Sequence, residues 1–349
     1  MMDTNNKCKC GLNKFINKEF CCINCEINNT HNYLCTKYII NKKDKKIFYK
    51  QNIRNTNPYN NNEIKTLFGK EEYLFLINDN SKSLENHCKK FTLFNINSIT
   101  VYDKYIKSRK ILFFMFPDKE IICKHYLPDK YKIINRNKMN YYKLNFLDLF
   151  YDSTKLFDVN DYEKTDTHIN LKGMIKFYKE ACKIISEKLN INIKSRYFDI
   201  KMKEVIGNGD LIQGVNIGTN IAKKIKENFY YIDDDISIIN GIYGKKTLYD
   251  KNNNIKLLDK NLKNISDNYD KKSLYWNDIK HVIIYSKNEN INNNIKVVIF
   301  YDSFLASTLN LYTELFNEVY MIKSIFNTKF IEYINPDFIL EFRIERFLL

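Results

Sequence analysis

Residues 296–304, KVVIFYDSF, join an apolar run to a short polar turn, and this stretch decides the fold. After Lys296, residues 297–301 form a continuous apolar run of the kind found in strands buried on both faces of a sheet. Asp302 and Ser303 follow directly, ahead of a segment at 308–316 that is predicted to be helical. In open α/β sheets, ligands bind outside the carboxyl ends of the parallel strands. The stretch therefore predicts a mostly parallel sheet with Ser303 at its functional edge.

Further strands and helices are expected on both sides of this stretch. The helix at residues 171–189 is predicted from apolar side chains recurring at three- and four-residue spacing. Buried strands are predicted from apolar runs at 73–77, 111–116, 318–322 and 338–340. Alternating strands and helices indicate an α/β domain, which we place at residues 67–349.

Charge and hydropathy limit the possible partners and location. The net charge is +15, but lysines are interleaved with acidic residues and form no basic stripe, so we expect no nucleic-acid partner. The polar start of the chain predicts no signal peptide, and no apolar run approaches the roughly 18 residues of a membrane-spanning helix. We therefore expect a cytoplasmic protein, either free or peripheral to a membrane complex.

A cysteine-rich module is predicted at residues 1–45, with a polar linker at 46–66. A segment this poor in apolar residues cannot be held together by burial alone, and intracellular cysteines serve more often as thiols or metal ligands than as disulfides. A structural zinc needs four such ligands; reduced structural thiols are the alternative. The candidate zinc ligands are Cys8, Cys10, Cys21, Cys22, Cys25, His31 and Cys35.

Two short motifs could carry chemistry. In TDTH (165–168), Asp166 lies two residues before His168, so its carboxylate can accept the Nδ1 proton and leave Nε2 as a base. In YDSF (301–304), Ser303 lies at a strand end, where amides entering a helix can stabilise an oxyanion. Each motif alone has an ordinary alternative, since a lone His is more often structural and Asp-Ser after a strand is more often an N-cap.

Several segments, in the same order, resemble the SGNH-hydrolase-like domain of the alginate O-acetyltransferase family. The likeness spans most of residues 67–349. It departs from the family pattern at Tyr73 and Ile169, where the family has Trp, and at Tyr301, where it has Gly. The segments that carry it are FGKEEYLFL (68–76), PDKE (117–120), YLP (126–128), TDTH (165–168) with Gly173, GDL (209–211), YDSF (301–304), PD (336–337) and ER (345–346).

The resemblance implies an SGNH-type three-layer α/β fold and a serine-dependent acyl transfer. Ser303 would be the nucleophile, His168 the base and Asp166 its orienting partner, with an acyl-enzyme intermediate. The expected reaction is acetyl transfer to a glycan or polysaccharide hydroxyl. A membrane-bound acyl-donor protein is an implied partner, while the acetyl donor itself is not specified. A carbohydrate esterase with the same triad and a non-catalytic glycan-binding relative are the alternatives.

Three further residues are candidates for substrate binding. Tyr301 lies beside the nucleophile turn, where it could stack on a sugar ring. Arg343 and Arg346 could bind an acidic sugar. The alternative for Arg346 is a salt bridge to Glu345 or to another acid.

Overall fold

The computed structural model describes residues 66–90, 96–207, 209–213, 224–232, 283–287, 291 and 293–348. By its internal contacts the chain divides into two units, Met1–Asn62 and Glu63–Leu349, and every described residue belongs to the second. The predicted zinc module and nearly all of the predicted linker lie outside the described residues. None of the helices in the described part combines the length and apolar composition needed to span a bilayer.

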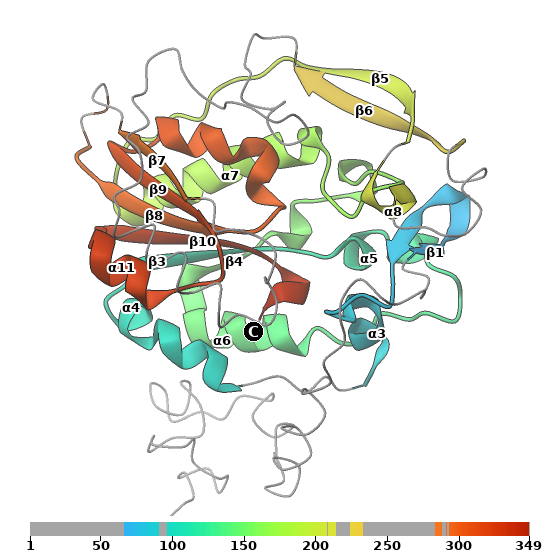
Figure 1. The fold of residues 1–349 in the computed structure, drawn as a ribbon, viewed down its shortest axis with the longest axis horizontal. Helices are drawn as coiled ribbons and strands as arrows, with labels where there is room; N and C mark the ends of the chain where they lie inside the picture. Colours follow the sequence, from blue (N-terminus) through green and yellow to red (C-terminus); the bar gives the residue numbers. More distant parts are fainter. Residues whose placement is uncertain are drawn as a thin grey trace, which may run out of the picture. The chain divides into compact units, whose positions relative to one another are not determined.

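A six-stranded sheet forms the centre of the second unit, in the order β4-β3-β10-β8-β9-β7 (Figure 1). The first five strands are parallel, and β7 runs antiparallel to β9. The predicted α/β class with a mostly parallel sheet is thus confirmed. The strands are β3 (Ile111–Phe116), β4 (Phe150–Asp152), β7 (Ile283–Lys287), β8 (Lys296–Tyr301), β9 (Glu318–Lys323) and β10 (Phe338–Ile344).

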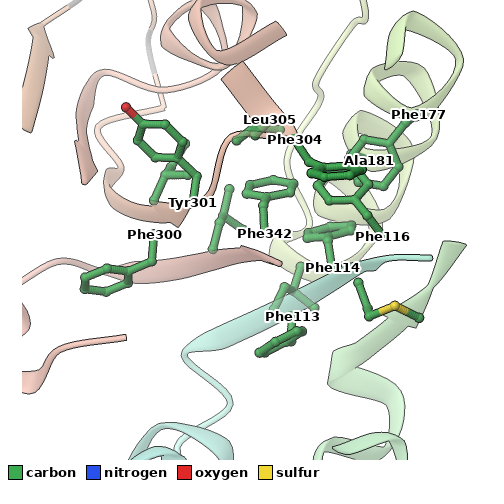
Figure 2. Close-up of a cluster of buried hydrophobic side chains, with 14 of the residues drawn as sticks. Phe113, Phe114, Phe116, Phe177, Ala181, Phe300, Tyr301, Phe304, Leu305 and Phe342 are labelled. Carbon is green, nitrogen blue, oxygen red and sulfur yellow. The ribbon is translucent and has the colours of Figure 1, made fainter. Parts of the chain in front are cut away.

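Helices pack on both faces of the sheet and give the fold three layers. On one face, Phe116 of β3 contacts Phe177 of α7 (Leu171–Leu189) at a ring-centroid distance of 4.5 Å. On the other face, Phe113 contacts Tyr142 and Phe146 of α6 (Asn137–Phe146). Figure 2 shows the two sets of phenylalanines on opposite sides of the strands. Both sides are buried, which explains why the central strands are continuous apolar runs.

The remaining elements surround this core. The antiparallel pair β1–β2 and the antiparallel ribbon β5–β6 are separate two-stranded sheets. The 3-10 helix η9 follows β8 and contacts α7. The bounds are β1 (Thr66–Phe68), β2 (Leu74–Leu76), α3 (Ser83–Cys88), α4 (Asp103–Lys107), α5 (Lys119–Ile122), β5 (Ile200–Ile206), α8 (Asp210–Gln213), β6 (Lys226–Ile232), η9 (Leu305–Glu314) and α11 (Thr328–Ile334).

Helix α7 begins directly after the TDTH motif. The Asn170 side chain accepts a hydrogen bond from the Gly173 amide at 3.0 Å, which caps the helix. A Cβ at Gly173 would lie 2.8 Å from the Asp161 Cβ, so the residue at this position has to be small for the helix start to pack there. The helix ends at Asn190, which has a left-handed backbone conformation with φ of 52°. Capping and close packing therefore fix where the preceding loop enters the helix.

Candidate active site

The turn that carries Ser303 is held by the side chain of Asp302. This buried carboxylate accepts hydrogen bonds from the Phe304 amide at 2.9 Å and from the Ile344 amide at 2.7 Å. Ile344 is the last residue of β10, so one side chain joins the turn after β8 to the end of the neighbouring strand. Ser303 is thereby fixed at the carboxyl edge of the sheet. No role was predicted for Asp302, although it is part of the YDSF motif.

Ser303 lies against the TDTH motif, from which 135 residues of chain separate it. The His168 Nε2 atom is 3.0 Å from the Ser303 Oγ atom, and His168 Nδ1 is 2.6 Å from Asp166 Oδ1. The structure therefore brings together Asp166, His168 and Ser303, the three residues that the sequence motifs predicted to be catalytic. About a third of the His168 side chain, 31%, is exposed, and Ser303 is half-buried.

Asp166 is bound by three N–H groups. Its Oδ1 atom also accepts the His168 amide at 2.9 Å, and its Oδ2 atom accepts the Asp210 amide at 2.9 Å. Burial alone would raise the pKa of Asp166, but the hydrogen bond and charge of His168, together with the two backbone amides, outweigh it and hold the pKa well below the ordinary value. Burial lowers the pKa of His168, but the hydrogen bond to Asp166 and the negative charges of Asp166 and Asp210 together raise it more, so its net shift is upward. The carboxylate thus stabilises the protonated imidazole.

The loop that carries Asp166 is anchored from two sides. The buried Lys119 Nζ atom donates to the main-chain oxygens of Lys164 and Asp166, each at 2.9 Å. On the other side, the Glu227 carboxylate accepts the Thr165 amide at 3.0 Å and the Thr165 hydroxyl at 2.5 Å. Burial lowers the pKa of Lys119. These anchors restrict the backbone on which the Asp–His pair is placed.

Residues 209–210 add a second layer of support. The Asp210 carboxylate accepts the Thr167 amide at 2.9 Å and the Thr167 hydroxyl at 2.6 Å, and it lies 3.7 Å from His168 Nδ1. A Cβ at Gly209 would lie 2.6 Å from the Asp166 amide nitrogen. Only glycine allows this close approach of the two backbones. No functional role was predicted for Lys119, Thr165 or Glu227. The sequence did mark two of the supporting segments, because GDL contains Gly209 and Asp210 and PDKE contains Lys119.

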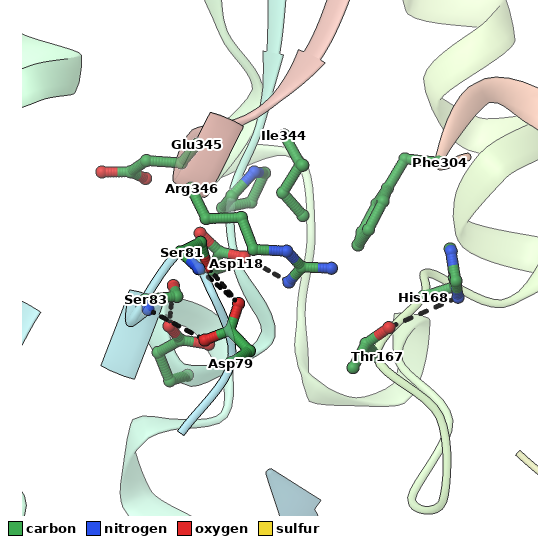
Figure 3. A network of polar contacts seen from close by, with 12 residues as sticks. Asp79, Ser81, Ser83, Asp118, Thr167, His168, Phe304, Ile344, Glu345 and Arg346 are labelled. Carbon is green, nitrogen blue, oxygen red and sulfur yellow. Dashed lines mark hydrogen bonds and ion pairs between the residues drawn. The ribbon is translucent and has the colours of Figure 1, made fainter. Parts of the chain in front are cut away.

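An aromatic ring connects His168 to Arg346. The Phe304 ring lies 4.7 Å from the His168 ring, and the Arg346 guanidinium carbon lies 5.2 Å from the Phe304 centroid. The guanidinium also donates to Asp118 Oδ1 at 2.6 Å (Figure 3). Arg346 is therefore paired with a buried acid, as in the salt-bridge alternative, and its partner is Asp118. Its contacts fit support of Phe304 better than capture of a substrate.

The other two predicted substrate residues are buried. Tyr301 is 3% exposed and belongs to the hydrophobic cluster of Figure 2. Arg343 is 2% exposed; its guanidinium donates to Glu341 at 2.7 Å and to the Ser324 carbonyl at 2.7 Å. Neither side chain offers a surface to a sugar. Their burial corrects the expectation that these residues bind substrate.

Two groups of potential metal ligands occur among the described residues. One consists of Asp166, His168 and Asp210, whose hydrogen bonds are given above. The other contains His87 and Glu120 together with Asp118. Burial alone would lower the pKa of His87, but its bonds to Glu120 and Glu345 raise it to about 10. A protonated imidazole cannot bind a metal, so this second group suits an ion-pair network. The seven predicted zinc ligands lie outside the described residues.

The sheet and the position of Ser303 define an α/β fold of the SGNH-hydrolase type. The structure of Bacillus cereus PatB1 is similar to it, with a TM-score of 0.52 and 15% sequence identity over 81% of this chain and 96% of that chain. PatB1 with a sulfonyl adduct gives 0.52 and 14%, covering 81% and 95%. The O-acetyltransferase domain of Pseudomonas putida AlgJ gives 0.47 and 12%, covering 82% and 92%.

No family model matches the sequence, and no curated protein is significantly similar to it. The likeness to PatB1 shows a common fold.

Proposed function

We propose that the protein is an O-acetyltransferase that acetylates hydroxyl groups of a polysaccharide or other glycan through Ser303, His168 and Asp166. The observation that carries the proposal is the contact of His168 Nε2 with Ser303 Oγ at 3.0 Å while Asp166 holds Nδ1 at 2.6 Å. These distances match the reach required between a nucleophile, its base and the group that orients the base. The motif resemblance supports acetyl transfer to a glycan as the reaction.

The first half-reaction would form an acetyl ester on Ser303. His168 Nε2 takes the hydroxyl proton as Oγ attacks the carbonyl carbon of the acetyl donor, and Asp166 stabilises the imidazolium. Among the described residues, the Ser303 amide makes no hydrogen bond, so it is available to donate to the oxyanion. When the tetrahedral intermediate collapses, the bond to the leaving group breaks and the leaving group takes the proton from His168.

The second half-reaction transfers the acetyl group. A sugar hydroxyl loses its proton to His168 Nε2 and attacks the ester carbonyl, and the Ser303 oxygen leaves with that proton. The products are an O-acetylated sugar and the free serine. Water in place of the sugar gives acetate, and the 31% exposure of the His168 side chain keeps this esterase reaction as the second candidate. A membrane-bound acyl-donor protein is also part of the proposal.

The test compares Ser303→Ala with Ser108→Ala. Both changes remove one hydroxyl, but Ser108 is an exposed residue after α4. We expect Ser303→Ala to abolish release of p-nitrophenol from p-nitrophenyl acetate, and Ser108→Ala to retain it. Mass spectrometry of oligosaccharides incubated with the activated ester then separates transfer from hydrolysis. Full turnover by Ser303→Ala would reject the nucleophile. Acetate formation at the same rate with and without every acceptor, and no acetylated sugar, would favour the esterase.

A further inference from the structure

The turn that follows strand β3 contains three consecutive buried charged residues. Asp118, Lys119 and Glu120 are 0%, 2% and 3% exposed. Charged side chains are rarely buried to this extent unless each one has a specific partner. Their partners lie in three different parts of the domain, and two of these parts carry the candidate catalytic residues. The turn therefore connects the two sides of the site.

Asp118 leads to the side of the site that carries the nucleophile. Its Oδ1 atom accepts a hydrogen bond from Arg346 Nη1 at 2.6 Å, and the guanidinium carbon of Arg346 lies 5.2 Å from the centre of the Phe304 ring (Figure 3). Phe304 directly follows Ser303 in the chain, and its ring lies 4.7 Å from the ring of His168. The ion pair is shielded from solvent on both sides, since both of its side chains are buried. A fixed guanidinium thus limits where the residue after the nucleophile can place its ring.

Lys119 leads to the side of the site that carries the base. Its Nζ atom donates to the main-chain oxygens of Lys164 and Asp166, each at 2.9 Å. The ring centroids of Tyr73 and Phe75 both lie 5.6 Å from this atom, and such contacts stabilise an ammonium group. Burial of an ammonium group is costly. Here its hydrogen bonds hold the main chain of the loop from which the orienting carboxylate projects.

The spacing between these two anchors is fixed by the covalent chain. Because Asp118 and Lys119 are consecutive, one peptide unit holds their Cα atoms ~3.8 Å apart. The nucleophile and the base that they reach are separated by 135 residues of chain. We propose that Asp118 and Lys119 are positioning residues, which together set the 3.0 Å contact between the serine Oγ and histidine Nε2 atoms. Both act through other residues rather than on the substrate. This inference rests on the proposed function and adds two residues to its machinery.

The experiment compares single variants of the full-length protein in the hydrolysis of p-nitrophenyl acetate. Lys119→Met removes the ammonium group and keeps a side chain of similar shape, and Asp118→Asn removes the negative charge of the ion pair. The control is Glu120→Gln, because Glu120 belongs to the same turn and is equally buried, but its carboxylate binds Ser83 and His87. Lys119→Gln, which keeps an N–H donor, replaces Lys119→Met if that variant does not fold.

We expect Lys119→Met to lower kcat by about 100-fold and to leave KM for the ester unchanged, because a misplacement of about 1 Å at the reacting groups has an effect of this size. Asp118→Asn should lower kcat by about tenfold, since its amide oxygen still accepts from the guanidinium but carries no opposite charge. Glu120→Gln should lose stability and keep the wild-type kcat. A wild-type kcat in folded Lys119→Met or Asp118→Asn, or an equal loss of kcat in Glu120→Gln, would overturn the proposal.

A spectroscopic readout separates this proposal from the proposed function. The proton between His168 Nδ1 and the Asp166 carboxylate should give a low-field resonance in the proton NMR spectrum, identified by its absence in His168→Gln. Lys119→Met should shift or abolish this resonance, and Glu120→Gln should leave it in place. If the wild type shows this pattern but hydrolyses no ester and acetylates no sugar, the proposed function fails while the positioning role of Lys119 stands. An unchanged resonance in Lys119→Met would overturn the positioning role even in an active enzyme.

Discussion

Replacing Asp166 with Asn tests the arrangement most sharply, because three N–H groups converge on that carboxylate: the His168 amide, His168 Nδ1 and the Asp210 amide. An amide has one oxygen. If that oxygen faces His168, the NH₂ group opposes the Asp210 amide. If it faces Asp210, the NH₂ group donates to Nδ1, and the ring must carry its proton on Nε2. In the second arrangement Nε2 is already protonated, so His168 cannot accept the proton of the Ser303 hydroxyl.

The two arrangements predict different sizes of effect on activity and stability. An unmatched buried donor costs about 1–3 kcal/mol of stability. Loss of the correct tautomer in serine proteases that use the same three groups lowers turnover on the order of 10⁴-fold, equivalent to about 5 kcal/mol of activation free energy. We therefore expect Asp166→Asn to reduce hydrolysis of p-nitrophenyl acetate by about 10³–10⁴-fold, with a modest fall in thermal stability.

The pH profile gives an independent readout of the same contact. In the wild type, hydrolysis should rise with pH through a midpoint above 6.5, because only neutral His168 is a base and its pKa is raised. In Asp166→Asn the bond that raises this pKa is lost and burial remains, so the midpoint should fall. Asp129→Asn is the matched control, at an exposed carboxylate paired with Lys70. Activity of a folded Asp166→Asn within about tenfold of wild type, with an unshifted midpoint, would refute this account of the site.

Three other predictions follow from the support around the site and from the N-terminal module. The pKa of His87 is raised in the folded protein, from 6.5 to about 10, so its contribution to stability is complete below pH 6.5 and is lost as the pH rises through 10. His87→Gln should therefore lower the free energy of unfolding by a few kcal/mol at neutral pH and flatten its decline with pH, as measured by urea titration. An unchanged pH dependence of stability would contradict this. Gly209→Ala should displace residues 165–166 and lower both ester turnover and melting temperature, whereas Ala at Lys110, an exposed position, should change neither; a fully active Gly209→Ala would show that the close approach is dispensable. Purified full-length protein should contain one zinc per chain by mass spectrometry of metals, and zinc-free protein with every N-terminal thiol titratable would remove the predicted zinc module.

The elements predicted most accurately are those specified by a pattern within their own residues. Strands β3 and β8 and helix α7 have the predicted bounds, because their apolar runs or one-sided periodicity begin and end sharply. The Asp–His pair was likewise contained in four consecutive residues. Its contact with Ser303 depends on strand order, which no local pattern specifies, and only the motif resemblance indicated it.

The departures from the predictions have physical causes in tertiary packing. The run at 73–77 contains the predicted buried strand, β2, but its pairing with β1 outside the main sheet was not predicted, since an apolar run does not specify its partner. The segment after Ser303 is the 3-10 helix η9 and starts earlier than predicted. Arg343 was assigned to substrate on its charge. Its partner Glu341 lies two residues earlier on the same face of β10, a spacing that points to an ion pair within the strand.

The strand order has a consequence for how the protein is made. Strand β10 lies between β3 and β8 in the sheet, yet it follows every other described strand in the chain. During synthesis the strands of both halves of the sheet are therefore made before the strand that joins them. Until then Asp302 lacks the Ile344 amide, and the turn that carries Ser303 is not tied to its neighbour. Until β10 is in place, the apolar strands β3 and β8 each lack a neighbour on one edge, and unpaired edges of this kind are prone to aggregate.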